Sequence, residues 1–282
     1  MTPRRAAVLG SPVRHSLSPL LHRTAYDLLG LSGWRYDAYD VDAAGLAGLL
    51  DGLDGSWAGL SLTMPLKSAV LNLLDRSSEL VRAVGGANTV LLHPDGRRGE
   101  NTDVPGLVAA LREHGVAGID GVGWACVLGG GATAAAGLAA LRELGETAPT
   151  VLVRDARTTR GLREAARRLG VQPRVDEWSD VGVEAVAQAE LVVSTTPPGS
   201  TDALAQRLPD RVAGTLFDVV YDPWPTALAA AWRDRGGEVI GGLDLLVHQA
   251  ALQVALMTGK ALDVPALVPA LRAAGEQALR AP

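Results

Sequence analysis

The chain has 282 residues, 48% of them hydrophobic, so it is long enough for two domains and apolar enough to form a substantial core. This composition argues against disorder, and no run of about 18 uncharged apolar residues is present that would predict a membrane span. A net charge of −5 gives no general attraction to nucleic acid.

The cysteine content and the first residues bear on location. The single cysteine, Cys126, excludes an internal disulfide and is typical of a reducing cytoplasm. Because Cys126 lies within an apolar run, we predict a buried strand residue rather than a nucleophile. No apolar signal segment opens the chain, so a cytoplasmic location is expected.

Strands and helices alternate through the first hundred residues. The patterns predict strands over 6–9, 34–41, 59–62 and 89–92, and helices over 19–29, 43–50, 65–74 and 104–114. A polar turn is expected at 94–96. The glycine-rich stretch 115–123 predicts a boundary, which closes a first domain at residues 1–114.

A second alternating series follows the glycine-rich stretch and predicts a domain over 115–241. We expect strands over 125–128, 150–153, 191–195, 215–220 and 238–240, with helices over 133–144 and 159–169. Two helices, 243–257 and 264–279, close the chain within a final segment, 242–282. Alternation of this kind predicts an α/β protein with parallel sheets that helices cover on both faces.

A glycine-rich turn opens the second series. Gly129, Gly130, Gly131, Ala132 and Thr133 follow a predicted strand and lead into a helix, as a dinucleotide-binding fingerprint requires. The glycines permit close approach to a pyrophosphate, and the helix N-terminus offers free N–H groups. A purely structural turn is the alternative interpretation.

The end of the next strand carries the selectivity signal for the cofactor. An acidic residue there binds the ribose 2′-hydroxyl of NAD, whereas an arginine accommodates the 2′-phosphate of NADP. Arg154 therefore favours NADP, although the acidic Asp155 follows it directly. The alternative is a solvated loop in an arginine-rich protein.

Two serines precede the first long helix. Ser16 and Ser18 lie just ahead of Pro19, where their hydroxyls could donate to a carboxylate. Ordinary N-capping of the helix by Ser18 is the equally weighted alternative.

Lysine is rare in this chain, because only two of the 26 basic residues, Lys67 and Lys260, are lysines. Lys67 follows Pro65 at the predicted start of a helix, where the helix dipole disfavours a cation. A lysine that persists at such a position suggests a task arginine cannot perform, such as releasing a proton.

Six segments, in order and with matching spacing, make the chain resemble the shikimate dehydrogenase family over nearly its whole length. They are Gly10-Ser11-Pro12 with His15-Ser16-Leu17-Ser18-Pro19; Leu62-Thr63-Met64-Pro65-Leu66-Lys67; Gly86-Ala87-Asn88-Thr89; Asn101-Thr102-Asp103; Gly129-Gly130-Gly131-Ala132; and Gly242-Leu243 with Gln249-Ala250.

The resemblance implies a fold of two α/β lobes. An N-terminal substrate-binding lobe and a Rossmann-type NADP-binding lobe are expected, with the C-terminal helices returning to the first lobe and the active site in the cleft. The implied reaction is reversible NADP-dependent reduction of 3-dehydroshikimate to shikimate, in aromatic amino-acid biosynthesis. No metal, nucleic acid or membrane partner is implied, and both monomers and homodimers occur in the family.

The resemblance also implies roles for individual residues. Lys67 and Asp103 form the catalytic pair, with Lys67 transferring the proton. The implied substrate-binding residues are Ser16, Ser18, Thr63, Asn88, Tyr221 and Gln249. The implied cofactor-binding residues are Gly129, Gly130, Gly131, Ala132, Thr133, Arg154, Thr195, Val219 and Gly242.

Three positions depart from the family pattern. Ser61 stands where asparagine is usual, Ala134-Ala135 replaces a frequent Ser-Arg, and Asp155 replaces a common Thr or Ser. Two other functions are weighed: a dehydrogenase for quinate or a related cyclic hydroxy acid, and a catalytically silent sensor that binds NADP or shikimate. Ser16, Ser18 and Arg154 argue against an NAD-linked quinate enzyme. The presence of both Lys67 and Asp103 argues against the sensor.

Overall fold

The chain divides into two compact units, each described here by itself. The computed structural model describes residues 3–116, 118 and 124–280, so the predicted boundary segment 115–123 lies largely outside the described residues. Unit 1 combines residues Met1–Gly106 with Leu246–Pro282, and unit 2 spans Leu107–Leu245.

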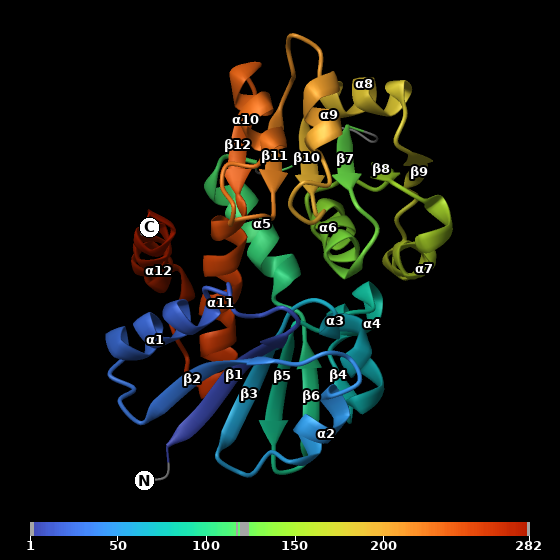
Figure 1. Cartoon of the computed structure of the whole chain (residues 1–282). Coiled ribbons are helices and arrows are strands. Elements are labelled where there is room, and N and C mark those ends of the chain that lie inside the picture. Colours follow the sequence, from blue (N-terminus) through green and yellow to red (C-terminus); the bar gives the residue numbers. More distant parts are fainter. Residues whose placement is uncertain (1–2, 117, 119–123, 281–282) are drawn as a thin grey trace. The chain divides into compact units, whose positions relative to one another are not determined.

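Unit 1 is built on a six-stranded sheet with the strand order β2-β1-β3-β5-β6-β4 (Figure 1). The strands are β1 (Arg4–Gly10), β2 (Trp34–Asp40), β3 (Trp57–Leu62), β4 (Arg76–Ser77), β5 (Thr89–His93) and β6 (Gly96–Glu100). The prediction of a parallel sheet is wrong here, because β5 runs antiparallel to both β3 and β6. A tight turn joins β5 to β6, and two strands joined this way must be antiparallel.

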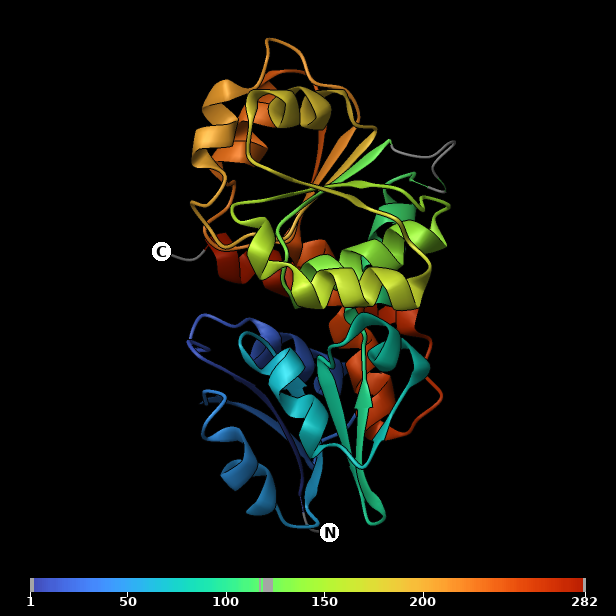
Figure 2. The same ribbon diagram turned by 90° about the vertical axis from the view of Figure 1, so that its right-hand side faces the viewer.

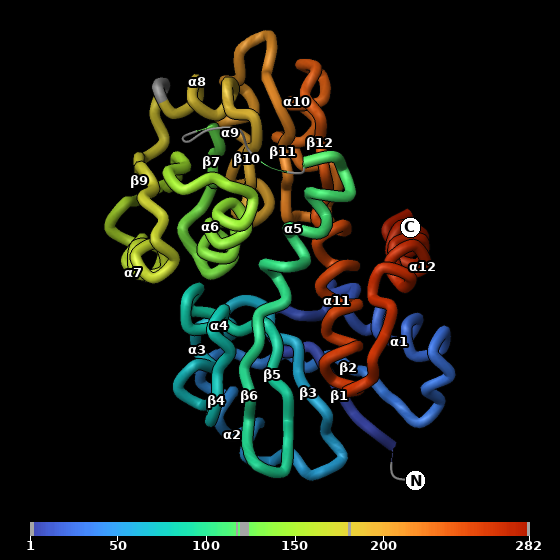
Figure 3. The backbone as a smooth tube through the Cα atoms, turned by 180° about the vertical axis from the view of Figure 1, so that it is seen from behind, coloured from blue at the N-terminus to red at the C-terminus, as the bar shows by residue number. Residues whose placement is uncertain are grey.

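Helices cover both faces of this sheet. Along β1, Ala7 and Leu9 pack with Leu46 of α2 (Leu46–Asp51) and Leu66 of α3 (Leu66–Ala69). The alternate strand positions face α1 (Ser18–Leu28) and α11 (Gly242–Thr258), since side chains along a strand alternate between faces. Figures 1 and 3, seen from opposite sides, show α2 in front of the sheet and α11 behind it.

The remaining elements of unit 1 are short or peripheral. The 3₁₀ helix η1 (Val70–Leu73) extends α3, α4 (Glu79–Val84) precedes β5, and α12 (Val264–Arg280) packs on α1. The continuous helix predicted over 65–74 is thus two short pieces. Lys67 is the second residue of a four-residue helix, which has too few aligned peptides for a strong dipole.

Unit 2 contains six parallel strands in the order β12-β11-β10-β7-β8-β9. They are β7 (Ala125–Leu128), β8 (Thr150–Val153), β9 (Arg174–Glu177), β10 (Leu191–Ser194), β11 (Thr215–Asp218) and β12 (Glu238–Gly241). Counted from β7, this is the 3-2-1-4-5-6 order of a dinucleotide-binding fold. The strand order reverses between β7 and β10, which is where such folds bind their ligand.

Helices cover both faces of the second sheet as well, as Figure 2 shows. On one face α8 (Asp180–Gln188), α9 (Asp202–Arg207) and α10 (Ala227–Asp234) pack on Leu128 and Val192, with Trp232 fully buried among them. On the other face lie α6 (Ala132–Glu143) and α7 (Arg160–Leu169), which is preceded by the 3₁₀ helix η2 (Ala156–Thr158). The helix α5 (Asp103–Glu113) begins in unit 1, and most of it belongs to unit 2.

The apolar elements match the predictions closely, whereas several polar ones were not predicted. Strands 125–128 and 150–153 are confirmed at both ends. The unpredicted elements are β4, β6, β9, α4, α8, α9, α10 and η2. No helix in the described ranges is long and apolar enough to cross a membrane.

Candidate active site

One edge of the unit 1 sheet gathers most of the predicted substrate and catalytic residues. Ser16 and Ser18 follow the carboxyl end of β1, and Thr63 follows that of β3. Since β5 is antiparallel to β3, the residue before it, Asn88, lies at the same edge, where Leu62 donates its backbone N–H to the Asn88 carbonyl. Asp103 follows the end of β6 and starts α5.

Lys67 and Asp103 form an ion pair at this edge. The distance from Lys67 Nζ to Asp103 Oδ2 is 2.6 Å, and the two side chains are only 16% and 8% exposed. A short pair with so little water around it holds the ammonium in one place. The two predicted catalytic residues therefore meet, although they lie 36 positions apart in the chain.

Asn88 connects this pair to α11. Its side-chain amide donates to Asp103 Oδ1 at 2.9 Å and to Gln249 Oε1 at 3.4 Å. The amide oxygen of Asn88 accepts from the backbone N–H of Thr102 at 2.8 Å. Because a backbone N–H can only donate, this contact determines which end of the Asn88 amide faces Asp103.

Thr63 sits tightly against the end of β1. Its backbone N–H donates to the Leu9 carbonyl, and a Cβ added at Gly10 would lie 2.2 Å from Thr63 Cγ2. Only glycine therefore fits at position 10 while Thr63 keeps its place. Thr63 as a whole is partly exposed at this edge.

The two serines do not cap the helix in the way the alternative interpretation required. Ser18 is the first residue of α1, whose N-cap position is Leu17, and no side chain caps this helix. Instead, Ser16 Oγ accepts the backbone N–H of Ser18 at 3.2 Å. The capping interpretation of Ser18 is thus wrong.

In unit 2, the predicted dinucleotide turn lies between β7 and α6, beside the point where the strand order reverses. Gly129 has φ +113°, and a Cβ there would lie 2.6 Å from Thr195 Oγ1. Gly131 is the N-cap of α6 and supplies no side-chain cap, and open space surrounds the position its Cβ would take. The N–H groups of Ala132 and Thr133 at this helix start suit a pyrophosphate.

Arg154 and Asp155 follow β8 at the same sheet edge. Hydrogen bonds from the Arg157 side chain and backbone hold the pKa of Asp155 below its usual value, so its charge is engaged locally. Arg160 pairs with Glu164 in the same way. Arg154 is exposed, and no ion pair is found for it among residues 3–116, 118 and 124–280. These contacts leave Arg154 as the arginine best suited to a phosphate.

The other predicted cofactor residues end neighbouring strands. Thr195 Oγ1 donates to the Leu128 carbonyl at 2.8 Å, next to Gly129. A Cβ at Gly242 would lie 2.0 Å from the Val219 carbonyl oxygen, so these two residues touch and only glycine fits. Tyr221, predicted to bind substrate, lies two residues beyond Val219 and belongs to unit 2.

Several residues at the unit 1 edge were not predicted as part of the site. Gln253 of α11 bonds Ser61 and Thr89, and Ser61 also bonds Tyr36. A signal for Gln253 was available, since Gln249 and Gln253 are four residues apart and such residues share a helix face.

Two buried titratable groups outside the site have strongly shifted pKa values. Burial raises the pKa of Cys126 to about 12, as expected for a buried strand residue and not for a nucleophile. Burial lowers the pKa of His22 to about 4. Among the described residues, no cluster of His, Cys, Asp or Glu side chains could hold a metal ion.

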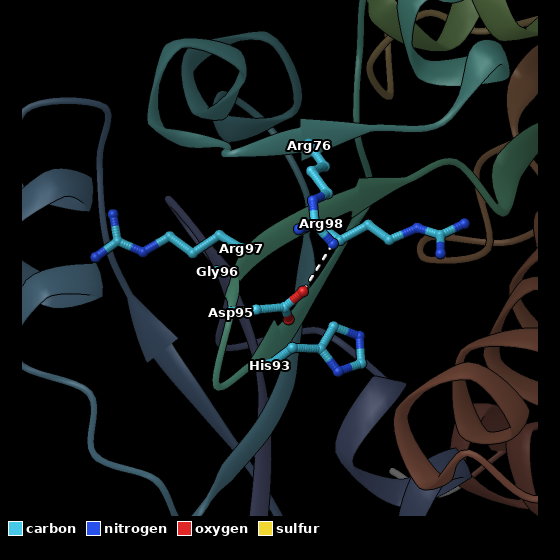
Figure 4. Close-up of a pocket in the computed structure, with 6 residues that line it drawn as sticks. All are labelled: Arg76, His93, Asp95, Gly96, Arg97 and Arg98. Carbon is cyan, nitrogen blue, oxygen red and sulfur yellow. Dashed lines mark hydrogen bonds and ion pairs between the residues drawn. The ribbon is translucent and has the colours of Figure 1, made fainter.

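A surface pocket at the β5–β6 turn contains none of the predicted site residues (Figure 4). Arg76 pairs with Asp95 at 2.7 Å, and Arg97 and Arg98 extend to opposite sides of their strand. Arg97 and Arg98 also pair with carboxylates, those of Asp51 and Glu100. Because each arginine already has an acidic partner, we assign no function to this pocket.

Comparison with known proteins covers nearly the whole chain. Residues 8–90 match the family model of the shikimate dehydrogenase substrate binding domain. The chain is 37% identical over 273 residues to a "Shikimate dehydrogenase (NADP(+))" of Thermus thermophilus, covering 96% of this chain and 98% of the relative.

Comparison with solved structures likewise finds shikimate dehydrogenases. The Mycobacterium tuberculosis shikimate dehydrogenase aligns with a TM-score of 0.83 at 41% identity, covering 96% of this chain and 99% of that one. A Thermus thermophilus shikimate 5-dehydrogenase, solved in complex with NADP(H) and shikimate, aligns with a TM-score of 0.79 at 35% identity, with the same coverage.

Proposed function

The chain belongs to the shikimate dehydrogenase family, whose reaction is the NADP-dependent interconversion of 3-dehydroshikimate and shikimate, and we propose that Lys67 and Asp103 carry this reaction here. The observation that supports these two roles is the short contact between Lys67 Nζ and Asp103 Oδ2, at a sheet edge bordered by Asn88 and Gln249.

Proton transfer is the task of Lys67. Bound NADPH supplies the hydride that reduces the ketone carbon. In the direction of reduction, the Lys67 ammonium donates a proton to the oxygen that becomes the hydroxyl, and in the reverse direction the amine accepts it. Asp103 holds Nζ in place through Oδ2.

Recognition of the substrate is divided between two sets of groups. The hydroxyls of Ser16 and Ser18, ahead of α1, suit a carboxylate, and we assign Tyr221 to the same carboxylate. The polar ends of Thr63, Asn88 and Gln249, together with Asp103, suit the ring hydroxyls. We propose a substrate-binding domain over 1–114 that the segment 242–282 completes, and the extent of unit 1 supports this division.

The cofactor residues of unit 2 fit a dinucleotide phosphate. Gly129 and Gly130 pack closely against neighbouring residues, whereas Gly131 leaves open space at the start of α6, where its side chain supplies no cap, and this turn suits the pyrophosphate. Arg154 suits the 2′-phosphate of NADP. The set is completed by Ala132, Thr133, Thr195, Val219 and Gly242. We propose the NADP-binding domain over 115–241, which lies within unit 2.

Turnover assays, together with a measurement of NADP binding, distinguish the proposed activity from both alternatives. We expect the purified protein to oxidise NADPH when 3-dehydroshikimate is added, and to use NADPH far better than NADH. No turnover with intact binding of NADP would favour the silent sensor. Comparable rates for shikimate and quinate in the reverse direction would favour a dehydrogenase of broader specificity.

Two further proposals concern the setting of the enzyme. We propose a cytoplasmic location, which the single buried cysteine supports. A monomer or homodimer is proposed from the family alone, and light scattering of the purified protein distinguishes the two states.

A further inference from the structure

A continuous chain of buried hydrogen bonds runs from α11 and β2 to the Lys67–Asp103 pair. Gln253, Ser61, Thr89 and Asn88 are each less than 5% exposed. Ser61 Oγ donates to Gln253 Oε1 at 2.7 Å, and Gln253 Nε2 donates to Thr89 Oγ1 at 2.9 Å. Thr89 Oγ1 then donates to Asn88 Oδ1 at 3.0 Å, so the chain ends on the residue that holds Asp103.

Two backbone contacts determine the direction of every bond in this chain. Gln253 Nε2 faces the Asn88 carbonyl, which can only accept, so Oε1 of Gln253 must face Ser61. Ser61 donates its single hydroxyl hydrogen to Oε1, and it therefore accepts the hydrogen of Tyr36 at 2.6 Å. Burial raises the pKa of Tyr36, so its hydroxyl stays protonated and donates.

The same reasoning determines the orientation of the Asn88 side-chain amide, at the end of this chain of hydrogen bonds. Asn88 Oδ1 accepts from both Thr102 N and Thr89 Oγ1, so the amide nitrogen must face Asp103. That nitrogen donates to Oδ1 of Asp103 and leaves Oδ2 for the Lys67 ammonium. A flip of the Asn88 amide would turn its oxygen toward a carboxylate oxygen, which is repulsive.

We propose that Gln253 is a positioning residue for the catalytic pair, acting through Thr89 and Asn88 to fix the carboxylate of Asp103. The inference rests on the roles of Lys67 and Asp103 proposed above. It also gives Ser61 a function, since a serine hydroxyl at this position connects Tyr36 with Gln253. Gln253 itself bonds neither Lys67 nor Asp103 in any contact described.

The decisive variants remove the hydrogen bonds of the Gln253 or Thr89 side chain while keeping nearly the same side-chain volume. Gln253→Met and Thr89→Val fill nearly the same space, so neither opens a large cavity. We expect each to lower kcat roughly 10- to 100-fold, the scale of a small misplacement of a reacting group, with the KM for NADP unchanged. Thr89→Ser keeps the hydroxyl and should restore most of the loss. Gln277→Met, at an exposed position of α12, controls for the glutamine-to-methionine change itself.

A double-mutant cycle separates positioning from mere stabilisation. If Gln253 acts through Asp103, Gln253→Met should add little further loss of kcat to Asp103→Asn. A residue that only stabilises the fold would lower the melting temperature and leave kcat of the folded enzyme unchanged. That result, with Asp103→Asn strongly impaired, would overturn the role of Gln253 and leave the catalytic pair intact.

The remaining outcomes are also informative. Near wild-type kcat in Asp103→Asn would overturn the catalytic pair itself, which is a different failure. If Gln253→Met does not fold, the comparison of Thr89→Val with Thr89→Ser decides the question, because Thr89 Oγ1 links Gln253 to the side-chain amide of Asn88. Equal kcat values for these two Thr89 variants would refute the proposal.

Discussion

Lys67 donates to Asp103 Oδ2 across 2.6 Å, while Asn88 holds the other oxygen of the same carboxylate. The carboxylate of Asp103, which holds the Lys67 ammonium, is therefore itself held in place by Asn88. We expect Lys67→Ala to lower kcat by roughly 10²- to 10⁴-fold, the range for loss of a general acid–base, with a smaller change in KM. Steady-state kinetics in both directions measure this loss.

Lys67→Arg separates proton transfer from charge. An arginine keeps the cation and can still pair with Asp103, but it does not release its proton near neutral pH. We expect this variant to be almost as impaired as Lys67→Ala. Turnover close to that of the wild type would leave Lys67 with a purely electrostatic role.

Arg154 is expected to select NADP over NAD. Arg157 and Arg160 are engaged with Asp155 and Glu164, whereas no acidic partner is found for Arg154, at the end of β8, in the part of the chain that the structure describes. A charge-assisted contact contributes about 1.5–3 kcal/mol, so Arg154→Ala should shift the ratio of kcat/KM for the two cofactors roughly 10- to 150-fold toward NAD. An unchanged ratio would assign the phosphate to Arg157 or Arg160 instead.

Ser16 and Ser18 are expected to bind the substrate carboxylate. Losing a hydrogen bond to a charged group costs about 1.5–3 kcal/mol, so each alanine variant should lower kcat/KM for shikimate roughly 10- to 150-fold. The Kd for NADP should not change. Quinate carries an extra hydroxyl on the carboxylate-bearing carbon, and the compact site should disfavour it in the wild type. A serine variant that weakened only NADP binding would contradict the assignment.

His22 is expected to make stability depend on pH. Its Nδ1 lies 2.9 Å from the Ser18 carbonyl, which requires the Nδ1–H tautomer, and Nε2 is buried with no hydrogen-bond partner among the described residues. Burial lowers the pKa from 6.5 to about 4 in the folded protein. The unfolded chain therefore takes up the proton first as the pH falls below about 6.5, and the free energy of unfolding decreases until about pH 4.

Urea unfolding of wild type and His22→Phe measures this effect. Between about pH 7 and about pH 5, the His22 contribution should cost about 2 kcal/mol of the free energy of unfolding. Phenylalanine retains the stacking on Tyr36 and cannot titrate, so the pH dependence of the variant should be weaker by that amount. Identical pH dependence in the two proteins would show that His22 is not the titrating group.

The sequence predicted the parts of the fold whose apolar pattern is strong. Strands β7, β8 and β10 of unit 2 are buried at every position, so their runs of Val, Leu and Ala are unambiguous. By contrast, β6 reads Gly-Arg-Arg-Gly-Glu and β9 reads Arg-Val-Asp-Glu. These segments form strands because a neighbouring strand pairs with them, and the local sequence pattern does not predict such pairing. The antiparallel β5–β6 pair was missed for the same reason.

The site residues also divide into those that sequence motifs predict and those that only tertiary contacts reveal. Motifs located Lys67 and Asp103, because their neighbours along the chain belong to recognisable segments. The contacts of Ser61 could not be predicted, since Tyr36 and Gln253 come from elements 25 and 192 positions away. A hydrogen-bond chain that joins β2, β3, α11 and β5 depends on tertiary packing, which periodicity does not report.

Unit 1 is formed by two segments from opposite ends of the chain, and this affects the order in which the protein can fold during synthesis. Unit 2 is a single stretch, Leu107–Leu245, and all of it has been made before the ribosome reaches Leu246. Unit 1 contains the first 106 residues, yet it lacks Gln249 and Gln253 until the last segment emerges. At a translation rate of roughly 5–20 residues per second, the nascent sheet of unit 1 waits about 7 to 28 seconds for the helix that covers one of its faces. During that interval Ser61 and Tyr36 face an unfinished core, so the newborn chain exposes there a surface for which a chaperone can compete.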